Sequence, residues 1–343
     1  MSELQFPDDF ISTSRPSPEE LEANERLELI VSIIVPIFFS LIGITGFIGN
    51  LLVIITVLFN QQMRNTTNLL ILNLSFADLL FICFCIPFTG ADYSLSWWPF
   101  GNFWCKSVQY LIICTAYISI YTLVLMSLDR YLAVCFPVNR IRSERNTIVS
   151  ILFIWVIVLV TCLPVFHAHG IVEYMDNGRN LTSCTFMNDN DFMAWSTFHI
   201  SFFTSSYLMP LIFISILYFL MLLRLWKSNL AQSTESKRGK KRVTRLVIVI
   251  VACFAILWLP IQTILLLKSL NHYTAQTHLT IALQICSHIL AYASSCVNPL
   301  LYAFLSENFR KSFRKIIYCH PSSHSRYLPT ATKFTATGTS GNT

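Results

Sequence analysis

The sequence predicts an all-α membrane protein: a seven transmembrane helix bundle with an amphipathic eighth helix. Three observations support this prediction. The chain is 54% hydrophobic and only 12% charged, whereas soluble proteins carry about 25% charged residues. The apolar residues form long uninterrupted segments, which indicates helices rather than strands. Lys and Arg are concentrated in every second connection between these segments.

Seven charge-poor segments are long enough to cross a bilayer as helices, which takes about 20 residues. They comprise residues 29–59, 66–93, 107–128, 147–172, 192–223, 246–267 and 275–305. Because the number of spans is odd, the two ends of the chain should lie on opposite sides of the membrane. We therefore expect an N-terminal extracellular tail (1–28), the bundle with its surface helix (29–318) and a disordered cytoplasmic tail (319–343).

The distribution of positive charge predicts the orientation, because cytoplasmic connections are enriched in Lys and Arg. The connections after the third, fifth and seventh segments carry most of these residues. The opposite side is acidic, with Asp92 near a helix end. We expect a multi-pass protein of the plasma membrane with its N-terminus outside. The polar N-terminal stretch lacks a basic region followed by a short apolar core, so we expect no cleavable signal peptide.

Two cysteines, Cys105 and Cys184, fall on the outer, oxidising side, and we expect them to form a disulfide. The bond would hold the connection between the fourth and fifth segments over the bundle. This connection also contains the glycosylation sequon Asn180-Leu181-Thr182. Two further sequons, at Asn65 and Asn73, fall inside the cell or in the membrane and are not expected to be used.

Residues 306–318 are predicted to form an amphipathic helix on the inner membrane surface. Phe309, Phe313 and Ile316 would share one face of this helix, with basic residues on the other. Cys319 follows at a position suited to palmitoylation, with an unmodified thiol as the alternative. The tail beyond it is rich in Ser and Thr, which kinases can phosphorylate.

Asp78 lies in the middle of a span, and an ionisable residue there marks a functional site by default. The spans hold no Lys or Arg to pair with it, so its partners must come from Asn50, Ser119, Ser295 and Asn298. These oxygen- and amide-bearing side chains suit a small hydrated cation such as Na⁺.

The third segment ends in Asp129-Arg130-Tyr131, an acid and a base at the point where a helix leaves the lipid. Adjacent side chains do not face each other well on a helix, so we interpret Arg130 as free to change partners, as a switch requires. The alternative is a charge pair that anchors the helix end. Pro260 and Pro299 should bend the sixth and seventh helices, because proline breaks the helical hydrogen bonds.

Motifs on all seven segments resemble those of rhodopsin-like (class A) G-protein-coupled receptors, over residues 29–319. They are Gly49-Asn50, the 74–79 stretch with Asp78, Trp98-Pro99-Phe100-Gly101, Cys105, Asp129-Arg130-Tyr131, Trp155, Pro210, Phe254, Trp258-Leu259-Pro260 and Asn298-Pro299-Leu300-Leu301-Tyr302. The resemblance implies a receptor that activates a heterotrimeric G protein. It also implies that arrestin and a receptor kinase act on the C-terminal tail.

The resemblance further implies roles for single residues. An allosteric sodium site would comprise Asp78, Ser119, Ser295 and Asn298. The activation switch would comprise Asp129, Arg130, Tyr131, Tyr218, Phe254, Trp258, Pro260, Pro299 and Tyr302. Many relatives carry an acidic residue at the inner end of helix 6 to hold the arginine, where this chain reads Lys240-Lys241-Arg242-Val243-Thr244. The arginine would then be held by Asp129 and weaker contacts, and we expect appreciable activity without ligand.

Two ligand classes are excluded by chemistry. No lysine lies between Lys268 and Lys311 for a retinal Schiff base, and residues 107–128 hold no carboxylate to pair with a biogenic amine. The motifs at 84–88, 94–105 and 258–262 resemble those of the galanin and insect allatostatin A receptors. The resemblance to the allatostatin A receptors implies as agonist a short amidated peptide that ends in an aromatic-Gly-Leu-like sequence. It also implies the inhibitory class of G protein. A galanin-like, other peptide or lipid ligand is the alternative.

Helical spacing predicts the ligand pocket, because side chains four residues apart share a face. The candidates are Asp92, Gln109, Ile113, Tyr117, Phe186, His199, Phe203, Gln262, Gln284, His288 and Tyr292. Amide and imidazole groups best bind a neutral C-terminal amide, and Gln109, Gln262 and His288 are our candidates for that role. An interhelical hydrogen bond is the alternative role of each. The histidines near the outer side, among them His169 and His199, match no strong metal motif and are expected to be solvated or interfacial.

Other functional classes fit the sequence poorly. A transporter tends to show internal repeats and several charges at mid-membrane, and an enzyme needs a nucleophile with a base or spaced metal ligands. The sequence shows neither arrangement. We expect no catalytic residue, no cofactor or metal beyond Na⁺ and no nucleic-acid partner, while membrane lipid surrounds the bundle.

Overall fold

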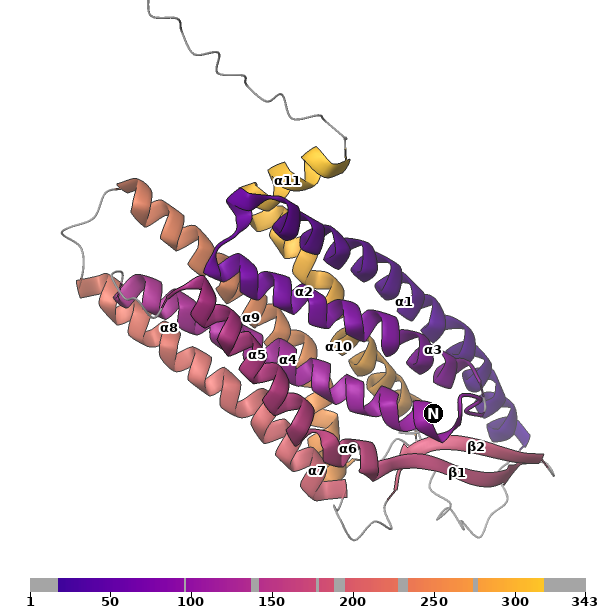
Figure 1. Ribbon diagram of the computed structural model, residues 1–343. Helices are drawn as coiled ribbons and strands as arrows, with labels where there is room; N and C mark the ends of the chain where they lie inside the picture. The colour runs from indigo at the N-terminus through magenta and orange to yellow at the C-terminus, as the bar shows by residue number, and fades with distance from the viewer. Residues whose placement is uncertain are drawn as a thin grey trace, which may run out of the picture.

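The computed structural model describes residues 18–95, 97–136, 142–176, 179–187, 195–227, 234–273 and 277–317. In this part of the chain, seven segments are long and apolar enough to cross a membrane: Arg26–Phe59, Thr66–Ser94, Gly101–Cys135, Glu144–Ala168, Trp195–Arg224, Thr244–Ser269 and His278–Leu305. These segments pack side by side as one bundle (Figure 1). The predicted seven-span fold is therefore confirmed.

Four of the spans consist of one helix each: α1 (Pro18–Phe59), α4 (Gly101–Cys135), α9 (Thr234–Ser269) and α10 (His278–Leu305). A 3₁₀ turn, η1 (Gln61–Met63), follows α1. The other spans are divided into α2 (Thr66–Phe84) with α3 (Ile86–Ser94), α5 (Glu144–Thr161) with α6 (Leu163–Ala168), and α7 (Trp195–Phe202) with the π-helical turn η2 (Phe203–Leu208) and α8 (Met209–Lys227).

Prolines account for two of these divisions. Pro87 and Pro164 each stand in the first turn of the second helix of a divided span, where the missing N–H is not needed for a helical hydrogen bond. Pro260 and Pro299 behave differently, because α9 and α10 continue through them as single helices.

Helix α4 is the central element of the bundle. It contacts α2, α5, α6, α8, α9 and the hairpin strands, while α10 packs between α1 and α9. Ile118, Ile120 and Met126 of α4 are completely buried. Leu41 of α1 and Phe153 of α5, at the periphery of the bundle, are more than half exposed. Apolar side chains on this outer surface are expected of a bundle whose solvent is hydrocarbon.

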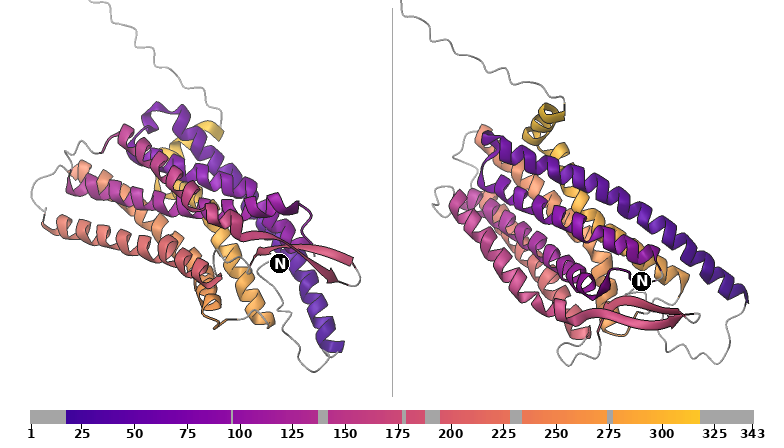
Figure 2. Two further views of the ribbon diagram at one scale, coloured as in Figure 1. Left: turned by 60° about the horizontal axis from the view of Figure 1, so that its bottom comes forward. Right: turned by 45° about the vertical axis from the view of Figure 1, so that its right-hand side comes forward.

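A β-hairpin lies at one end of the bundle and helix α11 (Glu307–Ile317) at the other (Figures 1 and 2). Strands β1 (His169–Asp176) and β2 (Arg179–Phe186) pair antiparallel, with Ile171 opposite Cys184. The sequence analysis placed residues 169–172 in the fourth helix, and that boundary was wrong because the apolar run continues from helix into strand. The sequence Asn177-Gly178 is a hairpin signal that would have predicted the pairing of these two strands.

Helix α11 confirms the amphipathic helix predicted for this region. Phe309 and Phe313 are buried, and the Phe309 ring stacks on Tyr302 of α10 with centroids 5.4 Å apart. Ile316 is partly exposed, at 36%. Cys319 and the tail that follows lie outside the described residues. At the other terminus, α1 already begins at Pro18 and so includes the last part of the expected N-terminal tail.

The packing of α1 on α10 depends on Gly49. A Cβ at position 49 would lie 2.9 Å from the Pro299 Cβ, whereas a Cβ at Gly43 would lie 3.8 Å from the Ile86 Cγ2. We expect Gly49→Ala to destabilise the protein by about 1–3 kcal/mol through overpacking. Gly43→Ala should be neutral or stabilising, because alanine favours helix by about 1 kcal/mol over glycine. Thermal unfolding of both variants in detergent tests this; equal melting temperatures would contradict it.

Candidate functional site

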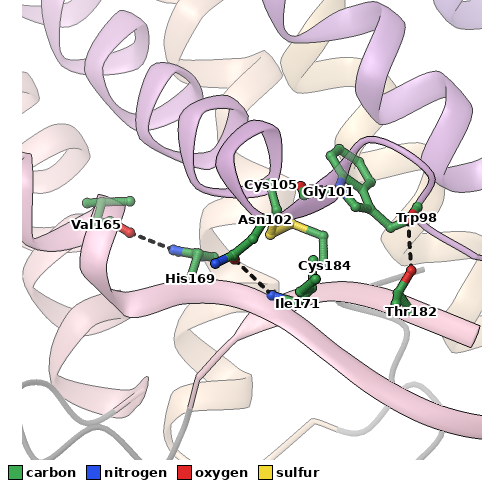
Figure 3. Close-up of a disulfide and its surroundings, with 9 residues drawn as sticks. All are labelled: Trp98, Gly101, Asn102, Cys105, Val165, His169, Ile171, Thr182 and Cys184. Atoms are coloured by element: carbon green, nitrogen blue, oxygen red, sulfur yellow. Dashed lines mark hydrogen bonds between the residues drawn. A yellow bond between two sulfur atoms is a disulfide. The ribbon is translucent and has the colours of Figure 1, made fainter.

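The hairpin is fastened to the outer end of α4 by the Cys105–Cys184 disulfide (Figure 3), as predicted. Both cysteines are buried. Beside the bond, the Ile171 N–H donates to Asn102 Oδ1 at 3.3 Å, and the Trp98 N–H donates to the Thr182 carbonyl at 2.7 Å. These contacts hold the hairpin close to the end of the bundle, as the sequence analysis expected of this connection.

The start of α4 also orients Trp98. Gly101 has φ +75°, a conformation that glycine adopts without steric cost. Its carbonyl accepts the Trp98 indole N–H at 3.0 Å. Trp98 is thereby held against the disulfide, and it lines the cavity described next.

An outer cavity of about 110 Å³ lies beneath the hairpin. Cys184 and His169 line it from the hairpin side and Trp258 from α9. Of the predicted ligand contacts, the lining includes Asp92, Gln109, Ile113, His199, His288 and Tyr292. The structure therefore gathers side chains from α3, α4, α7 and α10 around one space, as the spacing argument required.

Hydrogen bonds link α3 and α10 along one wall of this cavity, and a ring contact adds α2. The Tyr93 hydroxyl and His288 Nδ1 lie 3.2 Å apart, and the hydroxyls of Thr89 and Tyr292 lie 3.3 Å apart. The Tyr292 ring packs edge-on against Phe81, with centroids 4.8 Å apart. The wall thus presents hydroxyl and imidazole groups on an aromatic backing.

The other predicted ligand contacts lie outside the cavity lining. Gln262 and Gln284 are each only 1% exposed, and the Gln262 amide donates to Ser206 Oγ at 3.4 Å. The Tyr117 hydroxyl lies 2.7 Å from Ser205 Oγ. Phe186 packs edge-on against Trp195, and Phe203 packs against Tyr207. The contacts of Gln262 and Tyr117 match the interhelical role given above as the alternative.

Several lining residues were not in the predicted set, notably Thr89, Tyr93, Trp98 and His169. Thr89 and Tyr93 are four residues apart on the segment that carries Asp92, so spacing would have found them. The expectation that the outer histidines are solvated or interfacial was wrong for His169 and His199, which are 8% and 4% exposed. His167, His272 and His278 are exposed, as expected. The His169 ring packs on Phe186, and the His199 ring on Trp195.

A second, smaller cavity of about 30 Å³ lies around Asp78. Ser119, Ser295 and Asn298 also line it, so all four predicted sodium-site residues meet in one place. The Asn298 amide donates to Asp78 Oδ2 at 2.9 Å. Asn50, the other expected partner, instead donates to the Ser295 and Gly46 carbonyls, both at 2.9 Å. The space exceeds the roughly 10–15 Å³ that one water needs.

Trp258 connects the two cavities, because its side chain lines both. Its indole N–H donates to Ser294 Oγ at 3.1 Å, and its ring stacks on Phe254 with centroids 5.5 Å apart. Phe254 belongs to the same buried cluster as Ile120. A displacement of the Trp258 ring from the side of the outer cavity would therefore change the packing at the core of the bundle.

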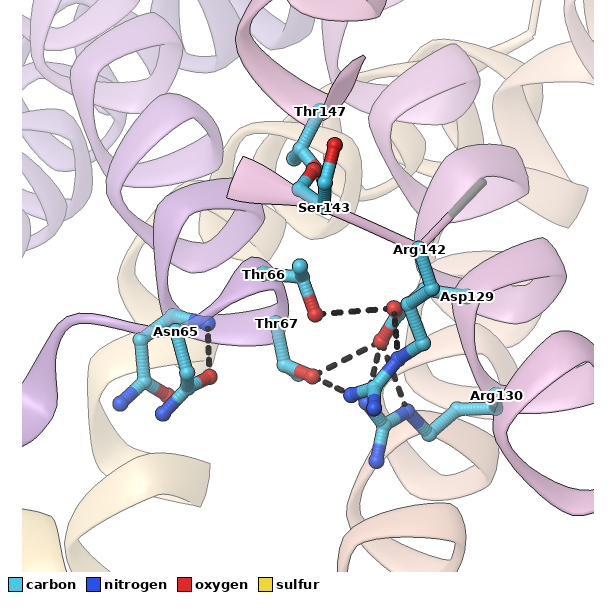
Figure 4. A network of polar contacts seen from close by, with 9 residues as sticks. Asn65, Thr66, Thr67, Asp129, Arg130, Arg142, Ser143 and Thr147 are labelled. Atoms are coloured by element: carbon cyan, nitrogen blue, oxygen red, sulfur yellow. Dashed lines mark hydrogen bonds and ion pairs between the residues drawn. The ribbon is translucent and has the colours of Figure 1, made fainter. Parts of the chain in front are cut away.

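At the inner end of the bundle, Asp129 is the centre of a polar network (Figure 4). It accepts hydrogen bonds from Thr66 at 2.9 Å and Thr67 at 2.8 Å, both at the start of α2. The Arg130 guanidinium pairs with it, with Nε 3.1 Å from Oδ2. The argument that adjacent charges would not face each other was wrong, because the Arg130 side chain folds back to its neighbour.

Arg142, which follows α4 in the chain, also binds Asp129, with Nε 2.7 Å from Oδ1. The sequence analysis did not assign this residue. Tyr218 packs against the inner core cluster, in which Tyr302 is completely buried. Tyr131 is half-buried, with its ring 6.0 Å from that of Phe136.

The three sequons occupy different environments. Asn180 is exposed on β2. Asn65 caps α2 through Asn68 N, and Asn73 is buried, donating to Thr122 at 2.7 Å and accepting from Trp155 at 2.8 Å. This environment accords with leaving Asn73 out as a glycosylation site.

A family model described as 7 transmembrane receptor (rhodopsin family) matches residues 49–302. The chain belongs to this family. The receptor is 53% identical to the allatostatin-A receptor of Bombyx mori over 325 residues, which cover 93% of this chain and 90% of the relative. It is 38% identical to galanin receptor type 2 of Mus musculus over 294 residues (83% and 76%) and 36% identical to galanin receptor type 1 of Mus musculus over 313 residues (90% and 88%).

Membership confirms the resemblance and fits a multi-pass receptor of the plasma membrane. The family is one of receptors, not of transporters or enzymes. The outer cavity and the inner Asp129 network thus lie at opposite ends of a receptor bundle, with Trp258 and the Asp78 cavity between them.

The disulfide should be required to hold the hairpin over the cavity of the receptor. Replacing both Cys105 and Cys184 by Ser should lower stability by about 2–4 kcal/mol and weaken ligand binding, because the hairpin loses its covalent tether. Thermal unfolding and ligand dose-response on surface-expressed receptor measure the two effects. Cys286→Ser, at an exposed free cysteine, is the control. Equal stability and potency in the double variant and the control would contradict the tether.

Proposed function

We propose that this receptor binds a short C-terminally amidated peptide of the allatostatin-A type in the outer cavity. Binding activates a heterotrimeric G protein of the inhibitory class at the inner face. The observation that carries the ligand class is the cavity lining. It offers amide, imidazole and hydroxyl groups, and the described residues that line it include no lysine or arginine.

A peptide amide fits this lining better than a free carboxylate. A buried carboxylate needs a cation or several strong donors, whereas a carboxamide is neutral and both donates and accepts hydrogen bonds. Gln109 and His288 line the cavity and can supply both kinds of partner. Asp92, also in the lining, favours positive charge in the rest of the peptide.

The size of the cavity supports a bound peptide end. A volume of about 110 Å³ admits a terminal side chain with its amide, and the remaining residues would lie against the hairpin. The Bombyx mori relative, with 53% identity, is named for allatostatin A, which supports a ligand of that type. The galanin receptors, at lower identity, make a galanin-like peptide the second candidate. The polar wall of Tyr93, His288 and Tyr292 disfavours a lipid.

The signal would pass from the peptide to the inner face through Trp258. Peptide contact on the indole would shift its stacking on Phe254 and its bond to Ser294. Movement of α9 and α10 around Pro260 and Pro299 would then open the inner end and release Arg130 towards the G protein. Tyr218 and Tyr302 would stabilise the released arginine in that state.

Sodium would act on the resting form of this path. A carboxylate and hydroxyl oxygens suit a hard cation, and Asp78, Ser119 and Ser295 bring such groups to one small cavity. Asn298 would complete the site. A bound Na⁺ would neutralise Asp78 and hold α2, α4 and α10 together.

The remaining partners follow from the family and from the tail. Arrestin and a receptor kinase would bind the Ser- and Thr-rich segment after Cys319. Palmitoylation of Cys319 and the surface helix α11 would hold the start of this segment at the lipid. Asn180 would carry the glycan.

The ligand class predicts a sharp effect of amidation. In cells expressing the receptor, an amidated peptide ending in Phe-Gly-Leu should lower cyclic AMP at about 100-fold lower concentration than the same peptide with a free carboxylate. This factor corresponds to about 2.7 kcal/mol, a typical cost of burying a poorly paired polar group. Cyclic AMP and calcium are read in parallel, with and without inactivation of inhibitory G proteins.

Two variants connect that result with the cavity. His288→Ala and Gln109→Ala should reduce the ratio of potencies between amide and acid, while Thr263→Ala, on the exposed face of α9, should leave it unchanged. Equal potency of the two peptides would refute the amide site. A response that survives inactivation of inhibitory G proteins would refute only the assigned G-protein class.

Sodium dependence gives a separate test. Agonist affinity of the wild-type receptor should fall several-fold when choline chloride is replaced by sodium chloride at about 0.1 M. Asp78→Asn should abolish this difference, because the amide is neutral and no longer attracts a cation. Radioligand competition in membranes measures it, with Ser32→Ala, at a hydroxyl in α1 bonded to the Leu29 carbonyl, as control. An unchanged sodium effect in Asp78→Asn would place the ion elsewhere.

A further inference from the structure

The Asp129 carboxylate is shared between two arginines. Arg130 binds Oδ2 and Arg142 binds Oδ1 at 2.7 Å, while Thr66 and Thr67 donate to the same two oxygens. The side chains of Asp129 and Arg130 are 7% and 6% exposed, and that of Arg142 is 35% exposed. One buried negative charge thus faces two positive charges, one internal and one at the rim (Figure 4).

Arg142 is held in place by the start of the next helix. Ser143 is the N-cap of α5, and its hydroxyl accepts from Asn146 N at 3.2 Å. The backbone at position 142 therefore continues directly into a capped helix. From this position the Arg142 side chain reaches Asp129 near the inner end of α4.

The two arginines differ in what their departure would leave behind. Activation requires Arg130 to leave Asp129, and a buried carboxylate that loses its only cation is strongly destabilised. With Arg142 in place, the carboxylate keeps a charge-assisted hydrogen bond after Arg130 has left. Arg142 also shares the charge of Asp129, so it weakens the attraction that holds Arg130.

We propose that Arg142 is the cation that keeps Asp129 paired when Arg130 leaves it. Efficient activation depends on this exchange of arginine partners at Asp129. Arg142 is then a positioning residue that promotes the active state, not a second lock on the resting state. This role of Arg142 rests on the proposed coupling of the receptor to a G protein. It also gives a physical reason for the activity expected without ligand.

The test measures nucleotide exchange on an inhibitory-class G protein, without ligand and with the amidated peptide ending in Phe-Gly-Leu. Arg142→Ala should lower both rates about tenfold, equivalent to about 1.4 kcal/mol. Arg142→Lys should restore most of the loss, because it keeps the charge. Arg145→Ala, at an exposed arginine in the first turn of α5, should change neither rate.

The Asp129→Asn background separates this role from direct contact with the G protein. If Arg142 acts through Asp129, Arg142→Ala should have no further effect once the carboxylate is gone. A further loss there would show a direct contact and overturn the proposal. A rise in ligand-free exchange with Arg142→Ala alone would show a lock on the resting state and would also overturn it.

Position 143 offers a test that leaves Arg142 intact. Ser143→Asp keeps a good N-cap and adds a carboxylate beside Arg142 that competes with Asp129. It should lower exchange as Arg142→Ala does, whereas Ser143→Asn, an equally good cap without charge, should not. Equal exchange in the two variants would contradict the proposal.

A readout independent of coupling distinguishes failure of this proposal from failure of the proposed function. A fluorophore at Arg245→Cys, with Cys83, Cys286 and Cys319 replaced by Ser, reports movement of the inner part of α9. The fraction of receptor in which the inner part of α9 has moved should fall in Arg142→Ala. An unchanged fraction would refute the exchange of arginine partners at Asp129. This conclusion would hold even if the wild-type receptor drove no nucleotide exchange because the assigned G-protein coupling was wrong.

Discussion

A polar side chain inside this bundle has to find its partner on the protein, because hydrocarbon offers no hydrogen bonds. The buried polar residues therefore link helices that are far apart in the sequence. Asn298 of α10 binds Asp78 of α2, and Asn73 of α2 binds both Thr122 of α4 and Trp155 of α5. At the inner end, Asp129 links α2, α4 and the segment before α5.

These links divide the receptor into a sequence of polar sites separated by apolar packing. The outer cavity is open to neutral polar groups, the Asp78 cavity is small and carries a carboxylate, and the Asp129 network is saturated with donors. Between them stand Trp258, Phe254 and Ile120, which in the proposed function would transmit displacement by contact because packed interiors deform little. By this route a ligand outside and a partner inside would act on each other without any direct contact.

Much of the site was predictable because its residues follow rules that hold for any membrane helix. The disulfide followed from compartment, and three of the four partners expected for Asp78, namely Ser119, Ser295 and Asn298, followed from the scarcity of partners for a buried acid. The ligand contacts were less predictable. Spacing places Gln262 and Gln284 on plausible faces, yet both side chains are buried outside the cavity lining, since rotation of a helix about its axis is set by its neighbours.

Two further features escaped the sequence analysis for local reasons. The first four residues of the hairpin were read as the end of a helix, because Gly170-Ile171-Val172 continues the apolar run. The Asn177-Gly178 hairpin signal was passed over. Adjacent side chains on a helix were expected to face each other poorly, but the long Arg130 side chain folds back to Asp129, its nearest anion. The charge pair given as the alternative is therefore present.

The sequence alone determined the number of spans, because length and hydropathy are properties of each segment by itself. Its motifs, at fixed places in these segments, indicated the receptor family. Only the tertiary structure decided which candidates share a cavity, and that Asp129 is bound by Arg142. These contacts depend on how helices rotate and tilt against each other, which packing between distant segments sets and no single segment encodes.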